Sequence, residues 1–574
     1  MTCITGKDVP LEDSIEKMSG LLLTLGFEIE EINWLNPVPN VWSVHMRDKN
    51  CPMLFTNGKG ATKEAARASA LGEYFEQLSC NYFFADFYLG KNVSTGDFVH
   101  YPNERWFPVS SDEIPKGLLD EATLSHYNMD DELTASMLID TNSGNRERGI
   151  CALPFIKQKT KEEIWFPVNI IGNLYASNGM AAGNTLNEAR VQAISEIFER
   201  HIKNTIISSG ISLPKIPDEV INRYPKMTEA IAALRQHGFI VYVLDASLGG
   251  KFPLVNVTLM NPEDGGCFAS FGAHPKFEVA LEKAVTELLQ GRALNQLEHF
   301  SEPSFDLQLV AEQHNLETHF IDSSGLVSWE LLSSDTDYEF ADWNMEGDSK
   351  EEFEHLCHLI HKVDMDIYIA DYEHLGVYCC RVIVPGMSEV YPVETLVRNN
   401  NNLGIGMRSR IMSIATLSDH VLEELYQEIG KKGLDDQQLI SELIGITPDS
   451  GSGFDGLRVV ELKYLIALRL QHLKVALACG NGLLQFACLN KERARLYRCL
   501  HQLLQFSLLE DGDVESFVHV LNDLYGAEQV SRCQAMLKGE GVFESLISID
   551  AELGPLQTHT SLLMAYQRLQ SAKI

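Results

Sequence analysis

Several features that would place a protein in a class at once are missing from this chain of 574 residues. Its twelve cysteines, from Cys3 to Cys533, include no C-x-x-C pair, so neither a cysteine zinc site nor a disulfide framework is predicted. No apolar run approaches the roughly eighteen residues of a membrane span, and the N-terminus has no basic segment followed by an apolar one. We therefore expect a reduced, cytoplasmic protein that does not enter membranes.

Positive charge is also scarce, because 46 Lys and Arg residues stand against 80 Asp and Glu, a formal net charge of −34. Such a surface repels the phosphate backbone of nucleic acids and anionic lipid surfaces. We expect no direct nucleic-acid ligand. A basic protein would be attracted to this surface, but acidic surfaces are also common for solubility alone.

Recognisable phosphate-binding loops are absent as well. Gly451, Gly453 and Gly456 have the G-x-G-x-x-G spacing, yet "ITPDS" precedes them where a dinucleotide-binding fold needs a buried strand. The segment "NGKGAT" that starts at Asn57 lacks the G-x-x-x-x-G-K-[ST] spacing of a P-loop. The first motif is interpreted as a loop, and neither motif predicts a nucleotide site.

What is present is an ordinary globular composition, 45% hydrophobic and 22% charged, with a change of pattern late in the chain. Before the asparagine run at 399–402, β-branched strands alternate with helices; after it, apolar residues recur at helical spacing. We predict an α+β domain over residues 1–398, a linker over 399–410 and an all-α, helical-repeat (TPR-like) domain over 411–574.

The α+β part contains a repeated segment. When "TKEAARASALGEYFEQ", from Thr62, is shifted by 123 positions, it aligns without a gap with "TLNEARVQAISEIFER", from Thr185. A shift of 214 positions aligns it with part of "KFEVALEKAVTELLQGR". All three copies keep two alanines and then two polar residues, which are Glu73 and Glu76, Glu196 and Glu199, and Glu287 and Gln290.

Each copy follows two strand-like runs joined by a turn, so we predict three pseudo-repeated hairpin–helix units. The runs are "VWSVHMRDKNCPMLFTNGKG", "WFPVNIIGNLYASNGMAAG" and "FPLVNVTLMNPEDGGCFASFGAH". The alanine stripes are expected to let the helices sit close together. Positions i and i+3 lie about 60° apart on a helix, so each polar pair projects from one face.

Glutamates at helical spacing usually form a solvated face, but three matched pairs behind alanine stripes predict a shared site. Two like charges ~4 Å apart repel by about 4 kcal/mol at an effective dielectric of ~20, so cations must offset them. Carboxylate oxygens are hard ligands that suit Mg²⁺, which in proteins commonly bridges carboxylates to nucleotide phosphates. The glutamates are also expected near helix C-termini, where the helix dipole favours positive charge.

This pattern, with "NGMAAGNTLNEA" before the second copy, resembles the YcaO proteins, ATP-utilising enzymes that modify peptide backbones. The resemblance includes "GKDVPLEDS", "LNPVPNVWSVH", "IDSSGL", "IADYEHLGVY" and "VIVPGMSEVYP", and thus about the first 395 residues. Within the family, the chain resembles the stand-alone type named as accessory factors for methylthiolation of a small-subunit ribosomal protein.

The resemblance implies that the six polar side chains hold Mg²⁺ ions that bridge the phosphates of ATP. It also implies nucleotide contacts from Lys7, Ser14, Ser69, Asn184, Glu188, Arg200 and Lys283. From the residues alone, Lys7 would be a solvated tail, Asn184 a helix cap, and Arg200 a partner of Glu196.

In the family, a nucleophile adds to a backbone carbonyl, the oxyanion is phosphorylated, and phosphate leaves. Azoline-forming members end in a P-x-P-x-P tail, whereas this chain ends "LQSAKI", which argues against azoline formation. The leading hypothesis is an ATP- and Mg²⁺-dependent enzyme that acts on a protein or peptide amide, or assists methylthiolation of a ribosomal protein with its methylthiotransferase. The alternatives are a non-catalytic adaptor and a small-molecule ligase or kinase; a homodimer is the default expectation.

Overall fold

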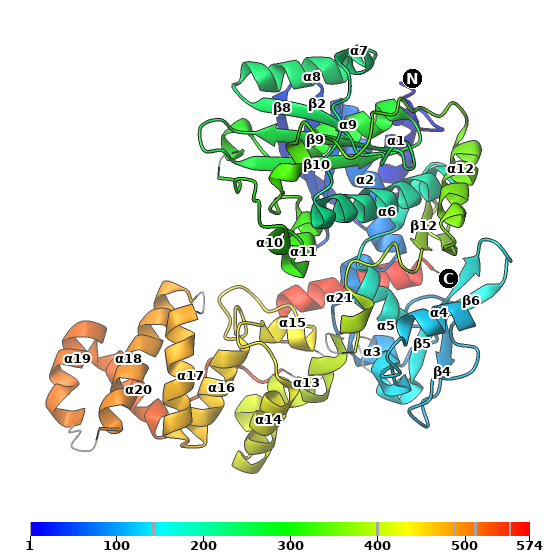
Figure 1. Cartoon of the computed structure of the whole chain (residues 1–574). Helices are drawn as coiled ribbons and strands as arrows, with labels where there is room; N and C mark the ends of the chain where they lie inside the picture. Colours follow the sequence, from blue (N-terminus) through cyan, green and yellow to red (C-terminus); the bar gives the residue numbers. More distant parts are fainter. Residues whose placement is uncertain are drawn as a thin grey trace.

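The computed structural model describes residues 2–140, 145–297, 299–397, 401–486, 489–509, 514–549 and 553–573. Figure 1 shows a body built from strands and helices, to which residues up to about 390 contribute, and a helical arm formed by most of the later residues. Mixed helix and sheet content confirms the predicted α+β class.

Two three-stranded antiparallel sheets each lie against a long helix of the body. One has the order β1–β2–β3 and is followed by α2; the other has the order β10–β9–β8 and is followed by α9. Their bounds are β1 (Ile29–Val38), β2 (Val41–Asp48), β3 (Phe55–Gly60), α2 (Lys63–Ser79), β8 (Ile240–Asp245), β9 (Leu254–Met260), β10 (Cys267–Ala273) and α9 (Phe277–Leu288). The first and third predicted hairpins are therefore β2–β3 and β9–β10, both antiparallel.

The second predicted hairpin is wrong. β6 (Glu163–Pro167) pairs with β5 (Ile150–Lys157), whereas β7 (Met180–Gly183) pairs with β12 (Tyr378–Ile383), far along the chain. A six-stranded sheet results, in the order β4–β5–β11–β12–β7 with β6 beside β5, where β4 is Arg105–Phe107 and β11 is Tyr368–Tyr372.

The run between β6 and β7 is helical, which explains the error. It forms the short helix α5 (Val168–Ile170) and a π-helical turn over Ile171–Tyr175. Ile170, Ile171, Leu174 and Tyr175 are buried at helical spacing, so an apolar run that also fits a strand packs as a turn of helix. The predicted three-fold repetition of the hairpin–helix unit therefore fails at its second unit, where α6 follows β7 but no hairpin.

The remaining helices of the body cover the sheets and connect them. α6 is the longest at 24 residues, and α12 packs beside it. The bounds are α1 (Leu11–Thr24), α3 (Gly90–Ser94), α4 (Glu121–Tyr127), α6 (Leu186–Ser209), α7 (Asp218–Ile221), α8 (Pro225–Gln236), α10 (Leu307–Val310), α11 (Gln313–Ile321) and α12 (Ser349–Lys362).

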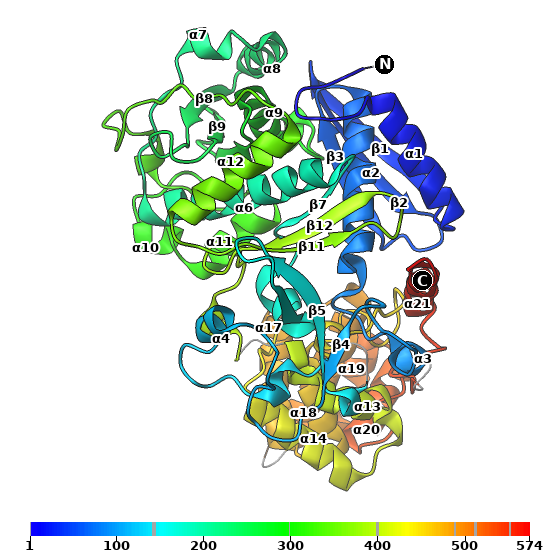
Figure 2. The ribbon, with the colours of Figure 1, turned by 90° about the vertical axis from the view of Figure 1, so that its right-hand side faces the viewer.

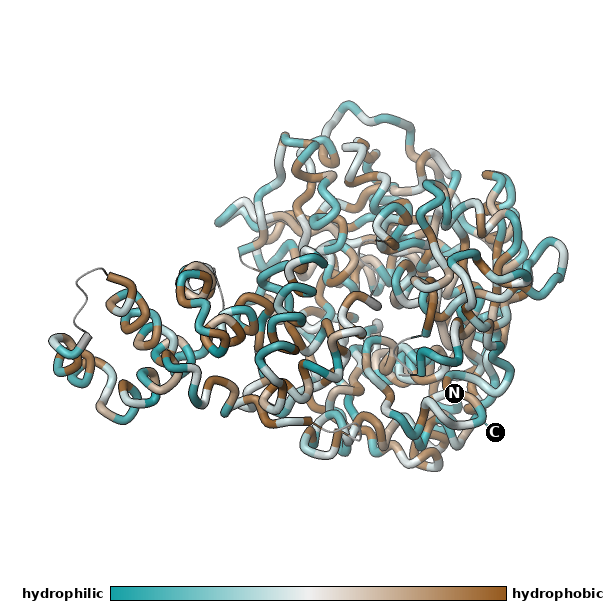
Figure 3. Tube along the Cα trace, turned by 90° about the horizontal axis from the view of Figure 1, so that it is seen from below, coloured by the Kyte–Doolittle hydropathy of each residue, from teal (hydrophilic) through white to brown (hydrophobic). Residues whose placement is uncertain are grey.

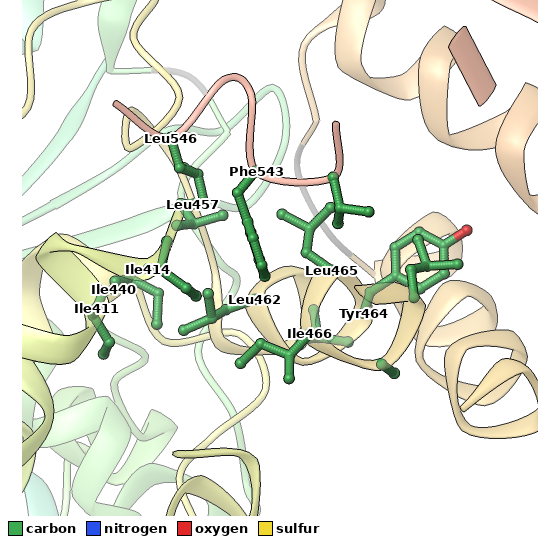
Figure 4. Close-up of a cluster of buried hydrophobic side chains, with 14 of the residues drawn as sticks. Ile411, Ile414, Ile440, Leu457, Leu462, Tyr464, Leu465, Ile466, Phe543 and Leu546 are labelled. Carbon is green, nitrogen blue, oxygen red and sulfur yellow. The ribbon is translucent and has the colours of Figure 1, made fainter. Parts of the chain in front are cut away.

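The later part of the chain is helical, as predicted. Its helices are α13 (Ile405–Met412), α14 (Asp419–Lys432), α15 (Ile440–Ile444), α16 (Val459–Arg469), α17 (Leu473–Phe486), α18 (Lys491–Ser507), α19 (Val518–Tyr525) and α20 (Ala527–Leu537). Figure 4 shows Phe543 and Leu546, from the segment after α20, beside Leu457 and Leu465 in the buried cluster of this region. Whether these helices form a TPR-like repeat stays a prediction.

The predicted linker, 399–410, falls at the start of this helical region. Residues 399 and 400 lie outside the described residues, and Asn401–Gly404 form a 3-10 turn that leads directly into α13. Met407 and Ile411 of α13 are fully buried in the C-terminal core. Residues 405–410 are therefore packed helix, and the domain boundary itself stays a prediction.

The last helix, α21 (Gln557–Ser571), leaves the arm and returns to the body. Figure 2 shows it near α3, and Arg568 donates to the carbonyl oxygen of Gly26, just after the end of α1, at 3.0 Å. Leu562, Ala565, Tyr566 and Leu569 belong to the same buried cluster as Tyr74 and Phe75 of α2. The hydrophobic core of the N-terminal body thus includes residues from the end of the chain.

Apolar and hydrophilic segments alternate along the helical arm, at the left of Figure 3, as expected for helices with one buried face. Within the described part of the chain, no helix combines the length and the apolarity needed to cross a membrane.

Candidate functional site

The three helices with the predicted carboxylates, α2, α6 and α9, each pack closely on the strand that precedes them. A Cβ atom built on Gly58 of β3 would lie 2.0 Å from the carbonyl oxygen of Ala66, and one on Gly272 of β10 would lie 2.2 Å from that of Ala280. At Gly183 of β7 it would lie 2.5 Å from the backbone of α6. The alanine stripes therefore let each helix approach its strand, rather than only its neighbouring helices as expected.

The first turns of these helices are positioned by local capping. Thr62 and Thr185, at equivalent places in the repeat, accept hydrogen bonds from the backbone N–H groups of Ala65 and Glu188. α9 has no side-chain cap. Thr185 takes the N-cap position of α6, so the alternative interpretation of Asn184 as the helix cap is wrong.

The helices enclose a cavity of about 580 Å³, and the side chains that the sequence analysis assigns to metal and nucleotide all line it. They are Lys7, Ser14, Ser69, Glu73, Glu76, Asn184, Glu188, Glu196, Glu199, Arg200, Lys283, Glu287 and Gln290. Residues from the N-terminus, α2, α6 and α9 are thus brought to one place, although nearly 300 positions separate the first from the last.

Two details of the carboxylate positions differ from expectation. α6 continues to Ser209, so Glu196 and Glu199 lie in mid-helix, and the argument from the helix C-terminus does not apply to them. α9 ends at Leu288, so Gln290 lies in the turn that follows, where its Nε2 donates to the carbonyl oxygen of Asn57. Periodicity alone could not detect that end, because the apolar pattern runs on through Leu289.

The two glutamates of α2 are held against their charged form. Burial raises the pKa of Glu73 to about 7; Lys59 opposes this rise and Glu196 adds to it. Burial also raises the pKa of Glu76 well above its ordinary value, with further contributions from Glu196 and Glu73. Burial, more than the neighbouring carboxylates, therefore favours the neutral form of both groups.

Lys59, on β3, is the residue of this site that sequence reasoning missed. Its ammonium forms an ion pair with Glu287, and it is attracted by Glu199, Glu73 and Glu196. Burial lowers the pKa of Lys59, while those three carboxylates raise it. Its segment, "NGKGAT", was considered only as a P-loop; its place on the strand before the first repeated helix could have pointed to it.

Other cations surround the carboxylates and have partners of their own. Arg200 pairs with Glu196 across one helical turn at 2.9 Å, as the alternative interpretation expected, and also donates to the Phe320 carbonyl at 3.2 Å. Lys283 donates to the Ala273 carbonyl at 3.3 Å, and burial lowers its pKa to about 8.

The N-terminal segment is fastened at the cavity by Glu188. Lys7 pairs with this carboxylate at 3.0 Å, and Asn184 donates to both of its oxygens, at 3.1 and 3.0 Å. Ser14 donates to Asn184 Oδ1 at 2.8 Å. Lys7 is thus held at the cavity, and its interpretation as a solvated tail is wrong.

Two family models match this chain. A family model described as YcaO cyclodehydratase, ATP- and Mg²⁺-binding, matches residues 57–388, and a model of the YcaO cyclodehydratase C-terminal domain matches residues 404–574. The chain belongs to the YcaO family. The first match covers more than half of the chain and contains every predicted site residue except Lys7 and Ser14.

Two sequence relatives agree with this assignment over the whole length. The chain is 52% identical to "Ribosomal protein S12 methylthiotransferase accessory factor YcaO" of Escherichia coli (strain K12) and 49% identical to an uncharacterized protein of Haemophilus influenzae; both alignments cover 100% of this chain and 98% of the relative. The structure of YcaO from Methanopyrus kandleri bound with AMPPCP and Mg²⁺ matches with a TM-score of 0.40 and 18% identity, over 66% of this chain and 92% of that one. ATP and Mg²⁺, the predicted cofactors, are those of the YcaO family.

Proposed function

We propose that this YcaO protein binds ATP through Mg²⁺ ions in the α2–α6–α9 cavity, and uses it to activate a backbone amide of a protein or peptide or to assist methylthiolation of a ribosomal protein. The observation that carries the proposal is that five carboxylates and one amide from separate parts of the chain line a single cavity together with seven predicted nucleotide ligands.

The residues present fit such a ligand. Glutamate oxygens are hard ligands of the kind that Mg²⁺ prefers, and five such side chains come from three helices that line one cavity. A cavity of about 580 Å³ is also within the usual size of small-molecule sites. Mg²⁺ would supply charge neutralisation of the phosphates.

In this proposal, Glu73, Glu76, Glu196, Glu199, Glu287 and Gln290 hold the metal. Lys7, Ser14, Ser69, Asn184, Glu188, Arg200 and Lys283 hold the nucleotide, and the chain's main contribution is to position it and to neutralise charge. A protein substrate then organises the acceptor amide.

The name of the E. coli relative supports a small-subunit ribosomal protein and its methylthiotransferase as partners. The net charge of −34 favours a basic partner such as a ribosomal protein. We also propose a cytoplasmic homodimer, a domain boundary near residue 398, and recruitment of partners by a TPR-like arrangement of the C-terminal helices.

Binding and turnover are tested on the full-length protein. Glu196→Gln is expected to weaken Mg–ATP binding at least tenfold in calorimetry with little loss of fold, whereas Glu278→Gln, which lines the same cavity and accepts from Thr5, keeps the wild-type affinity. Unchanged affinity in Glu196→Gln would show that the metal site is elsewhere.

Phosphate release with and without the methylthiotransferase and its ribosomal substrate then distinguishes an enzyme from an adaptor. We expect slow release alone and release faster by orders of magnitude in the complex, because positioning supplies several kcal/mol of a barrier. Glu76→Gln and Glu199→Gln should abolish the increase. Equal rates in the wild type and both variants would exclude catalysis in this complex and support the non-catalytic adaptor.

A further inference from the structure

The ammonium group of Lys59 lies where the proposed metal ligands meet. It forms an ion pair with Glu287 of α9 and interacts with Glu73 of α2 and with Glu196 and Glu199 of α6. These four carboxylates come from all three helices of the cavity. The ammonium of this one side chain therefore interacts with at least one carboxylate from each of the three helices.

The neighbouring cations are tied to groups outside the carboxylate cluster. Lys283 donates to the Ala273 carbonyl, Arg200 donates to the Phe320 carbonyl in addition to its pairing with Glu196, and Lys203 donates to the His319 carbonyl at 2.7 Å. Lys59 reaches further across the cluster than these three: its ammonium pairs with Glu287 of α9, and Glu73 of α2 and Glu196 and Glu199 of α6 also attract it.

The backbone of Lys59 has a fixed position while its side chain has a long, flexible stem. Gly58 and Gly60, on either side, pack so closely on α2 that a Cβ atom on them would lie 2.0 Å from Ala66 and 2.7 Å from Ala65. Strand β3 is thereby held on the helix. The four-carbon stem of lysine still lets the ammonium move by several ångströms without moving the strand.

We propose that Lys59 is an internal counter-ion, whose ammonium neutralises the carboxylates while no metal is bound and leaves their centre when Mg²⁺ enters with ATP. This inference rests on the proposed function, because it takes the same carboxylates as metal ligands. Without a cation, charges that converge from three helices would repel one another strongly in a low-dielectric cavity. The counter-ion lets the empty site fold.

The arrangement also gives the site a preference for metal that arrives with a nucleotide. Mg²⁺ alone must displace an ammonium that then loses its partners, which weakens metal binding. Mg²⁺ that enters with ATP brings phosphate oxygens, and these can accept the displaced ammonium. The site therefore discriminates against free Mg²⁺ and in favour of Mg–ATP.

The test compares Lys59→Met with wild type in the full-length protein, and uses Mg²⁺ alone as the probe. The control is Lys17→Met, which removes another lysine lining the cavity, one that lies over the Tyr378 ring. In EDTA, Lys59→Met should melt at a lower temperature than wild type and control. MgCl₂ should recover that loss, and calorimetry should give an affinity for Mg²⁺ at least tenfold higher than in wild type.

A Mg²⁺ affinity of Lys59→Met that is equal to or lower than that of the control would overturn the proposal. If the single variant does not fold, the double variant Lys59→Met/Glu287→Gln replaces it, because it removes both partners of the ion pair. Without metal, the double variant should fold and should melt at a higher temperature than Lys59→Met. A double variant that is no more stable than Lys59→Met would also overturn the proposal. If the wild-type protein did not bind Mg–ATP at all, the proposed function itself would be refuted.

Discussion

At the scale of single residues, glycines position the site as much as the glutamates that line it. Gly58, Gly183 and Gly272 each stand where a side chain would enter the backbone of the adjacent helix. Because the strand and the helix meet without a spacer, the backbone beside these glycines is held close to the helix that carries the carboxylates. Lys59 is the clearest case, since it lies between Gly58 and Gly60.

Gly58→Ala tests this packing. The added methyl group would lie 2.0 Å from the Ala66 carbonyl oxygen, a backbone atom that cannot rotate away, so strand and helix must separate. We expect a loss of at least about 1–3 kcal/mol in the free energy of unfolding, measured by urea denaturation, and weaker Mg–ATP binding. Gly20→Ala in α1, where a Cβ atom meets nothing within 4 Å, should be neutral or stabilising. Equal stability of the two variants would contradict the argument.

At the scale of elements, α2 has two faces with different tasks. Glu73 and Glu76 line the cavity, while Tyr74 and Phe75 between them are buried in a cluster that contains four residues of α21. Tyr566 of α21 donates to the Val99 carbonyl, and the Lys573 ammonium donates to the His100 carbonyl at 2.8 Å. The last helix therefore supports the helix that carries the first two carboxylates.

A chain truncated after Val397 lacks this support. On sequence alone, such a truncation would keep ATP binding if the tail only recruits partners; the packing of α21 leads us to expect instead that it does not fold or does not bind. A single substitution that tests the same support is Tyr566→Ala. It should lower the free energy of unfolding by about 3–5 kcal/mol, measured by urea denaturation, because it leaves a cavity at a fully buried aromatic position. The matched variant Tyr525→Ala, at the half-buried end of α19, should cost clearly less. A soluble truncated protein with wild-type ATP affinity would show that α21 is dispensable.

At the scale of the whole molecule, body and arm meet at a junction of three segments. The Tyr88 backbone N–H donates to the Gly445 carbonyl at 2.7 Å, and the Arg408 guanidinium lies over the Tyr88 ring at 4.3 Å. His559 of α21 accepts from the Thr447 N–H at 3.1 Å through Nδ1 and donates to the Tyr88 carbonyl at 2.8 Å through Nε2. Both ring nitrogens are used, and only the neutral imidazole can do so.

This junction should make stability depend on pH. Burial lowers the pKa of His559 from 6.5 to about 4, and the charge of Arg408 adds to the effect. The stabilisation is present above pH 6.5 and is lost as the pH falls towards 4, to a total on the order of 3 kcal/mol. His559→Gln should reduce the fall in the free energy of unfolding between pH 6.5 and 4. His314→Gln, at an exposed position, should leave that fall unchanged. Parallel curves for wild type and His559→Gln would refute this role.

The sequence by itself determined the features that local periodicity and spacing encode. Two of the hairpins and the helical nature of the tail follow from patterns within a few tens of residues. The shared register of Glu73, Glu196 and Glu287, with the alanine stripes behind them, follows from aligning three such segments. Only the tertiary structure decided that β7 pairs with β12, that Gln290 lies beyond the end of α9, that Lys59 enters the carboxylate cluster, and that α21 completes the core around α2. Each of these depends on contacts between distant segments, where the same local pattern fits more than one partner, and packing against the rest of the chain selects among them.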